Sequence, residues 1–158
     1  MKTNIKLTDE SRKEVATILN RVLSDEYLLY TKTRNAHWNV IGSNFSEMHK
    51  FFESQYDQVD EFIDEIAERA RSLGERAFGS LGEFMKTTRL KENSNGTQNG
   101  REFVSTLLAD HETIIQNLRT ELDTVAHKYG DMGTSDFLTG LMEKHEKMAW
   151  MLRAHLDS

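Results

Sequence analysis

The segment from Phe45 to Leu73 constrains the fold more than any other part of this sequence. It contains neither glycine nor proline, and its apolar residues recur about every 3.6 residues, the spacing of an amphipathic helix. Asn44 followed by Glu47 has the capping-box pattern, so we expect the helix to begin there. The apolar side of this predicted helix consists of Phe45, Met48, Phe52, Val59, Phe62, Ile63, Ile66, Ala70 and Leu73.

A second stripe, of ionisable residues, runs along the same predicted helix, roughly 130° from the apolar side at about 100° per residue. The stripe is mirror-symmetric about the midpoint between Asp57 and Asp60. Two copies packed antiparallel about a twofold axis at that midpoint would therefore bring each member to its mirror partner on the other copy. The members of the stripe are His49, Glu53, Asp57, Asp60, Asp64 and Glu68.

The stripe predicts a metal site only if two chains share it. Glu53 and Asp64 of one chain lie about 16 Å apart along the axis at 1.5 Å per residue, too far to share an ion. In the antiparallel pair they face each other, and His49 faces Glu68. Facing carboxylates repel unless a cation neutralises them or their pKa values rise, so we expect metal. The alternative is a solvated face, which is what charged stripes on helices usually are.

Composition supports a helical, acidic, cation-handling protein. The chain has 158 residues, 37% of them hydrophobic and 29% charged, which fits one domain over 1–158 after a short N-terminal tail at 1–7. The absence of proline favours helices, and the absence of cysteine excludes disulfides and thiolate zinc sites. A net charge of −6 argues against a general nucleic-acid binder. Without a signal-like N-terminus or a membrane-spanning run, we expect a cytoplasmic protein with no membrane contact.

Three further segments show helical spacing of apolar residues, at 8–37, 101–129 and 136–156. Thr8 is expected to cap the helix at 8–37, and Gly130 is expected to end the helix at 101–129. Short turns join the helices within each pair. A long, glycine-containing connection at 74–100, polar at 91–100 and with a short helix at 81–88, joins the pairs. This order predicts an all-α fold, a ferritin-like four-helix bundle whose long crossover between the second and third helices carries a short helix.

The usual metal site inside one such bundle is missing from the sequence. That site uses Glu-x-x-His on two helices. None of the six histidines has glutamate three residues before it. This absence again directs any metal to a subunit interface.

A family resemblance rests on a small set of motifs. They are N-A-H-W-N-V-x-G-x-N-F at 35–45, His49, D-x-x-A-E-R at 64–69 and Trp150 near the C-terminus. Over most of its length the chain resembles the Dps family of miniferritins. The resemblance implies a hollow homododecamer with twofold and threefold interfaces, and Fe(II) oxidation at the twofold interfaces, preferably by hydrogen peroxide. It also implies storage of Fe(III) mineral in the cavity and protection against oxidative stress.

The resemblance also assigns roles to the site residues. His37, His49 and Glu53 come from one subunit, and Asp64 and Glu68 from its partner. His37 with Asp64 and Glu68 holds one iron, His49 with Glu53 holds the second, and Glu68 bridges them. Glu53 stands where the family commonly has Asp, so direct ligation and ligation through water both stay open. Taken alone, His37 could also be a buried, hydrogen-bonded histidine at a helix end.

Other residues receive weaker assignments. By resemblance, Asp136 at the start of the last helix lines an acidic threefold pore for iron, with Glu146 and Glu143 as lesser candidates. The alternative for Asp136 is an ordinary acid at a helix N-terminus. His111 and His145 lie within apolar stripes, so we expect satisfied core or interface histidines. Trp38 is expected to pack in the core, and a role in scavenging oxidising equivalents is the less favoured interpretation.

DNA binding is expected to be weak or absent at physiological salt. The few cations of the N-terminal region, which are Lys2, Lys6, Arg12 and Lys13, are interleaved with acids. Two competing hypotheses stay open. One is a non-catalytic, nucleoid-associated cage that binds and protects DNA, and the other is a helical bundle without metal.

Overall fold

The structure is a computed structural model that describes residues 3–92 and 98–156. Lys2 of the tail, residues 93–97 of the predicted polar stretch and the last two residues lie outside the described part. The described part contains four long helices, one short helix and two very short strands. These elements are α1 (Asp9–Asn39), β1 (Val40–Ile41), α2 (Phe45–Ser72), α3 (Leu81–Thr87), β2 (Gln98–Asn99), α4 (Gly100–His127) and α5 (Met132–Ala154).

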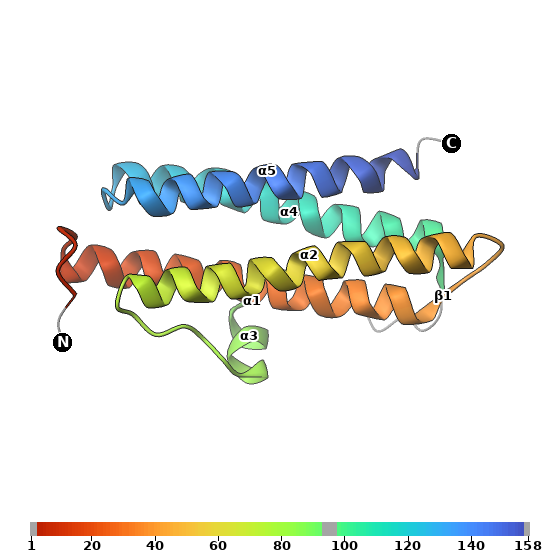
Figure 1. Ribbon diagram of the computed structural model, residues 1–158, viewed down its shortest axis with the longest axis horizontal. Coiled ribbons are helices and arrows are strands. Elements are labelled where there is room, and N and C mark those ends of the chain that lie inside the picture. Colours follow the sequence, from red (N-terminus) through yellow and green to blue (C-terminus); the bar gives the residue numbers. More distant parts are fainter. Residues whose placement is uncertain (1–2, 93–97, 157–158) are drawn as a thin grey trace.

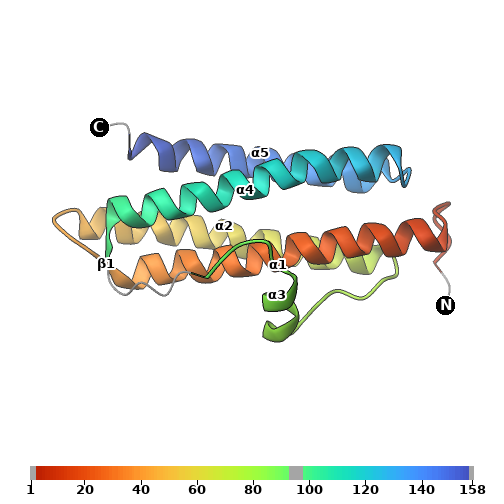
Figure 2. The same cartoon turned by 180° about the vertical axis from the view of Figure 1, so that it is seen from behind.

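The four long helices form two antiparallel hairpins, α1 with α2 and α4 with α5, stacked on each other (Figure 1). The crossover leaves the end of α2 and carries α3, which lies against α1 on the outside of the bundle, as both views show (Figure 2). The predicted all-α, ferritin-like bundle with a helix in its long crossover is therefore confirmed. None of the described helices has an apolar stretch long enough to cross a bilayer.

The helix starts agree only partly with the sequence predictions. Thr8 caps α1 as expected, because its side chain accepts a hydrogen bond from the Ser11 N–H. The capping box predicted at Asn44 is wrong. The backbone of Asn44 is not extended (φ −99°, ψ 21°), and its side chain makes no capping bond. A capping box occurs instead at Asn99, whose side chain accepts from the Glu102 N–H while the Glu102 side chain accepts from the Asn99 N–H.

The turn between α4 and α5 also differs from prediction. Gly130 adopts a positive φ of 71°, as expected of a glycine that follows a helix. The last helix begins at Met132 rather than at Asp136, because the Asp131 side chain accepts a hydrogen bond from the Thr134 N–H at 2.9 Å. Asp136 consequently lies within the helix and does not open it.

A short parallel strand pair was not predicted. Val40 pairs with Gln98 and Ile41 with Asn99, so the turn between α1 and α2 is tied to the segment that precedes α4. This pairing fixes the end of the bundle at which α1 stops and α2 starts.

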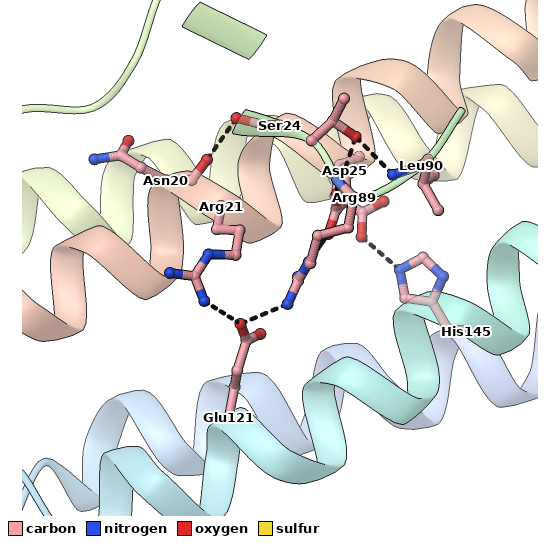
Figure 3. Close-up of polar contacts among 10 residues, drawn as sticks. Asn20, Arg21, Ser24, Asp25, Arg89, Leu90, Glu121 and His145 are labelled. Carbon is pink, nitrogen blue, oxygen red and sulfur yellow. Dashed lines mark hydrogen bonds and ion pairs between the residues drawn. The ribbon is translucent and has the colours of Figure 1, made fainter. Parts of the chain in front are cut away.

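Buried ion pairs hold the crossover to the bundle core. Arg89, just after α3, donates from Nε to Asp25 of α1 at 2.8 Å and from a terminal nitrogen to Glu121 of α4 at 2.7 Å. Arg21 adds a third contact, 3.6 Å from Glu121, so that two guanidinium groups point at one carboxylate (Figure 3). Around this polar centre, side chains such as Leu19 and Phe62 are almost fully buried, each stabilising the fold by about 1.5–3 kcal/mol.

Candidate metal centre

Two of the predicted site residues, His37 and His49, lie against each other where α1 meets α2. Their rings stack with centroids 3.7 Å apart. Nδ1 of His37 lies 2.8 Å from the His49 carbonyl oxygen, and Nδ1 of His49 lies 2.8 Å from the His37 carbonyl oxygen. Because a carbonyl oxygen only accepts, each Nδ1 carries the proton and donates. With Nδ1 used in this way, Nε2 is the nitrogen of each ring that a metal can bind once it carries no proton.

The predicted acids follow on the exposed side of α2. Glu53 lies one helical turn after His49, so the two side chains share one face of the helix. Asp64 and Glu68 are also exposed but lie further along the same helix. The structure thus brings His37 to His49 and leaves Asp64 and Glu68 apart from them within one chain.

A single chain does not assemble the predicted centre. Within residues 3–92 and 98–156, no three or more histidine or carboxylate side chains form a group that could hold a metal ion. The mirror-symmetric stripe requires this outcome, because its members complete one another only across two chains. Imidazole nitrogen and carboxylate oxygen are a donor set that suits Fe(II). The assignment of His37, His49, Glu53, Asp64 and Glu68 as iron ligands stays a prediction.

Aromatic residues and one arginine surround the histidine pair. The Tyr56 ring meets the His37 ring edge-on, with centroids 5.3 Å apart. Burial raises the pKa of Tyr56, and the nearby charges of Glu53 and Asp57 raise it further. The phenol therefore stays protonated and neutral beside the acidic stripe.

The expectation that Trp38 packs in the core is wrong for the single chain. Trp38 is 62% exposed, although it lies in α1 next to a buried histidine. The Arg34 guanidinium lies over its ring at 4.9 Å from the centroid and over the Tyr56 ring at the same distance. A signal existed in the apolar spacing of α1, because residue 38 lies outside the apolar stripe of this helix.

The proposed pore residues differ in their surroundings. Asp136 and Glu143 are exposed, and the Asp136 side chain forms no hydrogen bond or ion pair with the described residues. Glu146 instead forms an ion pair with Arg119 of α4, so its charge is already balanced within the chain. The assignment of Asp136, with Glu143 and Glu146 as lesser candidates, to an acidic pore stays a prediction.

The prediction that His111 and His145 are core residues is confirmed, but they are not fully satisfied, because Nε2 of His145 has no hydrogen-bond partner among the described residues. Both are buried, and their Nδ1 atoms lie 2.9 Å apart. The sequence analysis missed the acids near them, Asp25 and Glu26, which are fully buried in α1. A signal existed: both stand in line with Val22 and Leu29 on the apolar face of the predicted helix.

Comparisons with known proteins show the family to which this chain belongs. The family model for the ferritin-like domain matches residues 16–158. The DNA protection during starvation protein of Brevibacillus brevis is 34% identical over 157 residues, covering 99% of this chain and 100% of that protein. An uncharacterized low temperature-induced protein of a Nostoc species is 45% identical over 154 residues, covering 98% of this chain and 86% of that protein.

A solved structure is similar to this chain in both fold and sequence. The crystal structure of a Dps protein from Vibrio cholerae O1, described as a member of a broad superfamily of ferritin-like diiron-carboxylate proteins, has a TM-score of 0.91 and 32% identity. The alignment covers 99% of this chain and 98% of that one. This chain belongs to the ferritin-like family and, within it, to the Dps proteins.

Proposed function

We propose that this protein is a ferroxidase and iron store that oxidises Fe(II) at centres shared between two subunits. In this proposal the subunits form a dodecameric cage through twofold and threefold interfaces, and the Fe(III) product is stored inside it as mineral. Membership of the ferritin-like family supports iron as the substrate, and the diiron-carboxylate description of the Vibrio cholerae relative supports a two-iron centre.

The observation that carries the proposal is the reciprocal pairing of His37 and His49. Each Nδ1 is used by a backbone carbonyl, so only the two Nε2 atoms remain to bind a ligand. The two metal-binding nitrogens thus have fixed positions beside the acidic stripe before a metal binds.

The carboxylates supply the charge that two Fe(II) ions require. Glu53 of the same subunit, with Asp64 and Glu68 of a second copy, brings three negative charges to the two imidazoles. Three carboxylates facing one another without a cation would repel, so bound Fe(II) also stabilises the subunit contact. Incomplete protein ligation leaves room for the oxidant.

Hydrogen peroxide suits a two-iron centre for a simple reason of electron count. Two Fe(II) ions each lose one electron, and one peroxide with two protons takes up both electrons to become two water molecules. The O–O bond is thus broken by a pair of electrons rather than by one, which avoids release of a hydroxyl radical. We propose peroxide as the preferred oxidant on this ground.

The alternative function is a DNA-binding cage with little catalysis, which the name of the Brevibacillus brevis relative favours. The charges of this chain favour it less. Arg12 is 5% exposed, donates to the Leu73 carbonyl oxygen and pairs with Asp9, so its guanidinium is not free for phosphate. A gel shift at moderate salt, with apo and iron-loaded protein, separates the two. A strong shift with negligible iron oxidation would favour the DNA-binding cage.

The proposed function is tested by anaerobic Fe(II) titration followed by peroxide. Wild type should oxidise about two irons per site in a fast phase, because each site holds two irons. The double variant Asp64→Ala with Glu68→Ala should lose that phase. The matched control, Asp57→Ala with Asp60→Ala, removes the same charge from the same stripe and should retain it. An unchanged fast phase in the first variant would reject the site.

A further inference from the structure

A second group of ionisable side chains lies in the centre of the bundle, outside the proposed iron site. Glu26 of α1, His111 of α4 and His145 of α5 are each at most 1% exposed. Nε2 of His145 lies 2.8 Å from Oε1 of Glu26, and Nδ1 of His145 lies 2.9 Å from Nδ1 of His111. His145 thus connects α4 within its own hairpin to α1 of the other hairpin.

The carboxylate of Glu26 depends on His145. Neither of its oxygens has a hydrogen-bond partner among the described residues, and the 2.8 Å contact with Nε2 of His145 is a close polar contact without the alignment of a hydrogen bond. A buried carboxylate is costly unless it is protonated or faces a positive charge. One proton shared between Glu26 and His145, beyond that of a neutral imidazole, removes this cost.

The contact between the two rings limits the cluster to that one extra proton. A hydrogen bond between two Nδ1 atoms needs a donor on one ring and an acceptor on the other. An imidazolium has donors at both nitrogens, so only one ring of the pair can be charged. If His111 were protonated beside a charged His145, two N–H groups would face each other at 2.9 Å.

No neighbouring carboxylate is free to stabilise a charge on His111. On α4, Asp110 pairs with Lys32 of α1 at 2.5 Å. On α1, Asp25 pairs with Arg89 of the crossover. Burial in this site, and to a smaller extent the charge of His145, hold the pKa of His111 well below its ordinary value.

The charged groups beside His145 are also paired at the surface. Glu146 pairs with Arg119 of α4, and Lys144 pairs with Glu65 of α2 at 3.2 Å. The side chain that α2 presents to the imidazole of His145 is Phe62, with ring centroids 5.4 Å apart. A protonated His111 side chain would therefore have to leave the core to reach a partner for its charge.

We propose that Glu26, His145 and His111 form an acid-sensitive latch that holds the α4–α5 hairpin against α1. When a second proton enters the cluster, His111 parts from His145 and moves toward water, and the middle of α4 loosens from α5 and α1. Because opening takes up one proton at His111, the closed form is fully favoured above the ordinary imidazole pKa of about 6.5 and loses stability as pH falls below it.

Amide hydrogen exchange of the assembled full-length protein tests the latch. Protection of the middle of α4 and α5, corrected for intrinsic rates, should fall about tenfold per pH unit below about pH 6.5, because one proton is taken up. In His111→Gln, an amide that does not titrate faces His145. The protection of α4 and α5 in this variant should therefore not depend on pH in this range. His127→Gln, at an exposed histidine paired with Asp123, should behave as wild type.

Three results would overturn the latch, two of which come from the pH dependence and one from where the loss occurs. The first is protection of α4 and α5 in wild type that stays constant between about pH 7 and pH 5.5, the range in which a free imidazole titrates. The second is the same loss in His111→Gln as in wild type. If His111→Gln fails to assemble, the location of the loss of protection in wild type still tests the latch. A loss spread equally over all four long helices contradicts a latch at their centre, and a loss confined to α4, α5 and the facing part of α1 supports it.

Discussion

The rings of His37 and His49 stack, and each residue's carbonyl oxygen accepts a hydrogen bond from the other residue's ring. This reciprocal pair joins the last turn of α1 to the start of α2, so neither ring can turn without breaking a bond to the other helix. Both Nε2 atoms are thereby fixed in the absence of metal, which is what a binding site gains from oriented ligands.

His49→Phe should therefore impair both stability and iron oxidation. Phenylalanine can stack on His37 but cannot donate to its carbonyl oxygen, and the loss of one such bond costs about 1 kcal/mol of unfolding free energy. The variant also lacks one metal-binding nitrogen, so the fast phase of Fe(II) oxidation should disappear. Urea unfolding and stopped-flow oxidation measure the two effects. His127→Phe, at an exposed histidine, is the control, and a wild-type rate in His49→Phe would argue against ligation.

The surface of the single chain predicts an assembly. Large apolar side chains are exposed at the α1–α2 turn and on α3, among them Trp38 at 62% and Leu81 at 71%. Exposed large apolar side chains that gather in patches mark interaction sites, so we expect these to be covered in an assembly. Analytical ultracentrifugation should find a particle of about twelve subunits, each of 18.3 kDa. A stable monomer would instead support the hypothesis of a helical bundle without metal.

Removing the positive charge that anchors the crossover should destabilise the protein strongly. Arg89→Met leaves Asp25, which is fully buried, without its ion pair, and it removes one of the two arginines at Glu121. An uncompensated buried charge costs roughly 3 kcal/mol or more of unfolding free energy. Arg76→Met breaks the exposed pair with Glu83 and should change the stability little. Chemical denaturation of the two variants makes the comparison, and equal effects would contradict the anchoring role.

Two asparagines provide a matched test of helix capping. Asn99→Ala removes the bond that the Asn99 side chain accepts from the Glu102 N–H, which is one half of the capping box. This loss should cost about 1 kcal/mol of unfolding free energy. Asn44→Ala should cost clearly less, because the Asn44 side chain makes no capping bond. Thermal unfolding of both variants checks this order. The reverse order would mean that the sequence pattern at Asn44, rather than the structure, identifies the cap.

The helices and their order could be predicted because apolar spacing is a local property. The segment predicted at 45–73 matches α2 almost to the residue, and the spacing of its mirrored stripe is enough to imply a site shared by two chains. The strand pair at Val40 and Gln98 could not be predicted, since two residues far apart in sequence meet there only after the bundle has formed. The same holds for the anchoring of Arg89, which depends on acids from two helices.

The residues of the candidate site were named from the sequence, and their role as iron ligands stays a prediction, whereas the geometry of the histidine pair could not be predicted. The motif around His37 and the stripe from His49 named the residues, whereas the reciprocal bonds between ring and carbonyl depend on how α1 and α2 meet. The exposure of Trp38 was missed because its residue type suggests a core position, although its place outside the apolar stripe of α1 predicts exposure in the single chain. The acid Glu26 was missed because a single charge on an apolar face looks like an exception until its partner, His145, is known.

Mixing two inactive variants tests the shared site most directly. The variant His37→Gln with His49→Gln lacks the imidazoles, and Asp64→Asn with Glu68→Gln lacks the acids, so each alone should oxidise Fe(II) slowly. After random co-assembly about half of the twofold pairs are mixed, and each mixed pair contains one complete site of two. The account therefore predicts recovery of about one quarter of the wild-type fast phase. No recovery on mixing, with both variants correctly assembled, would contradict a centre built from two subunits.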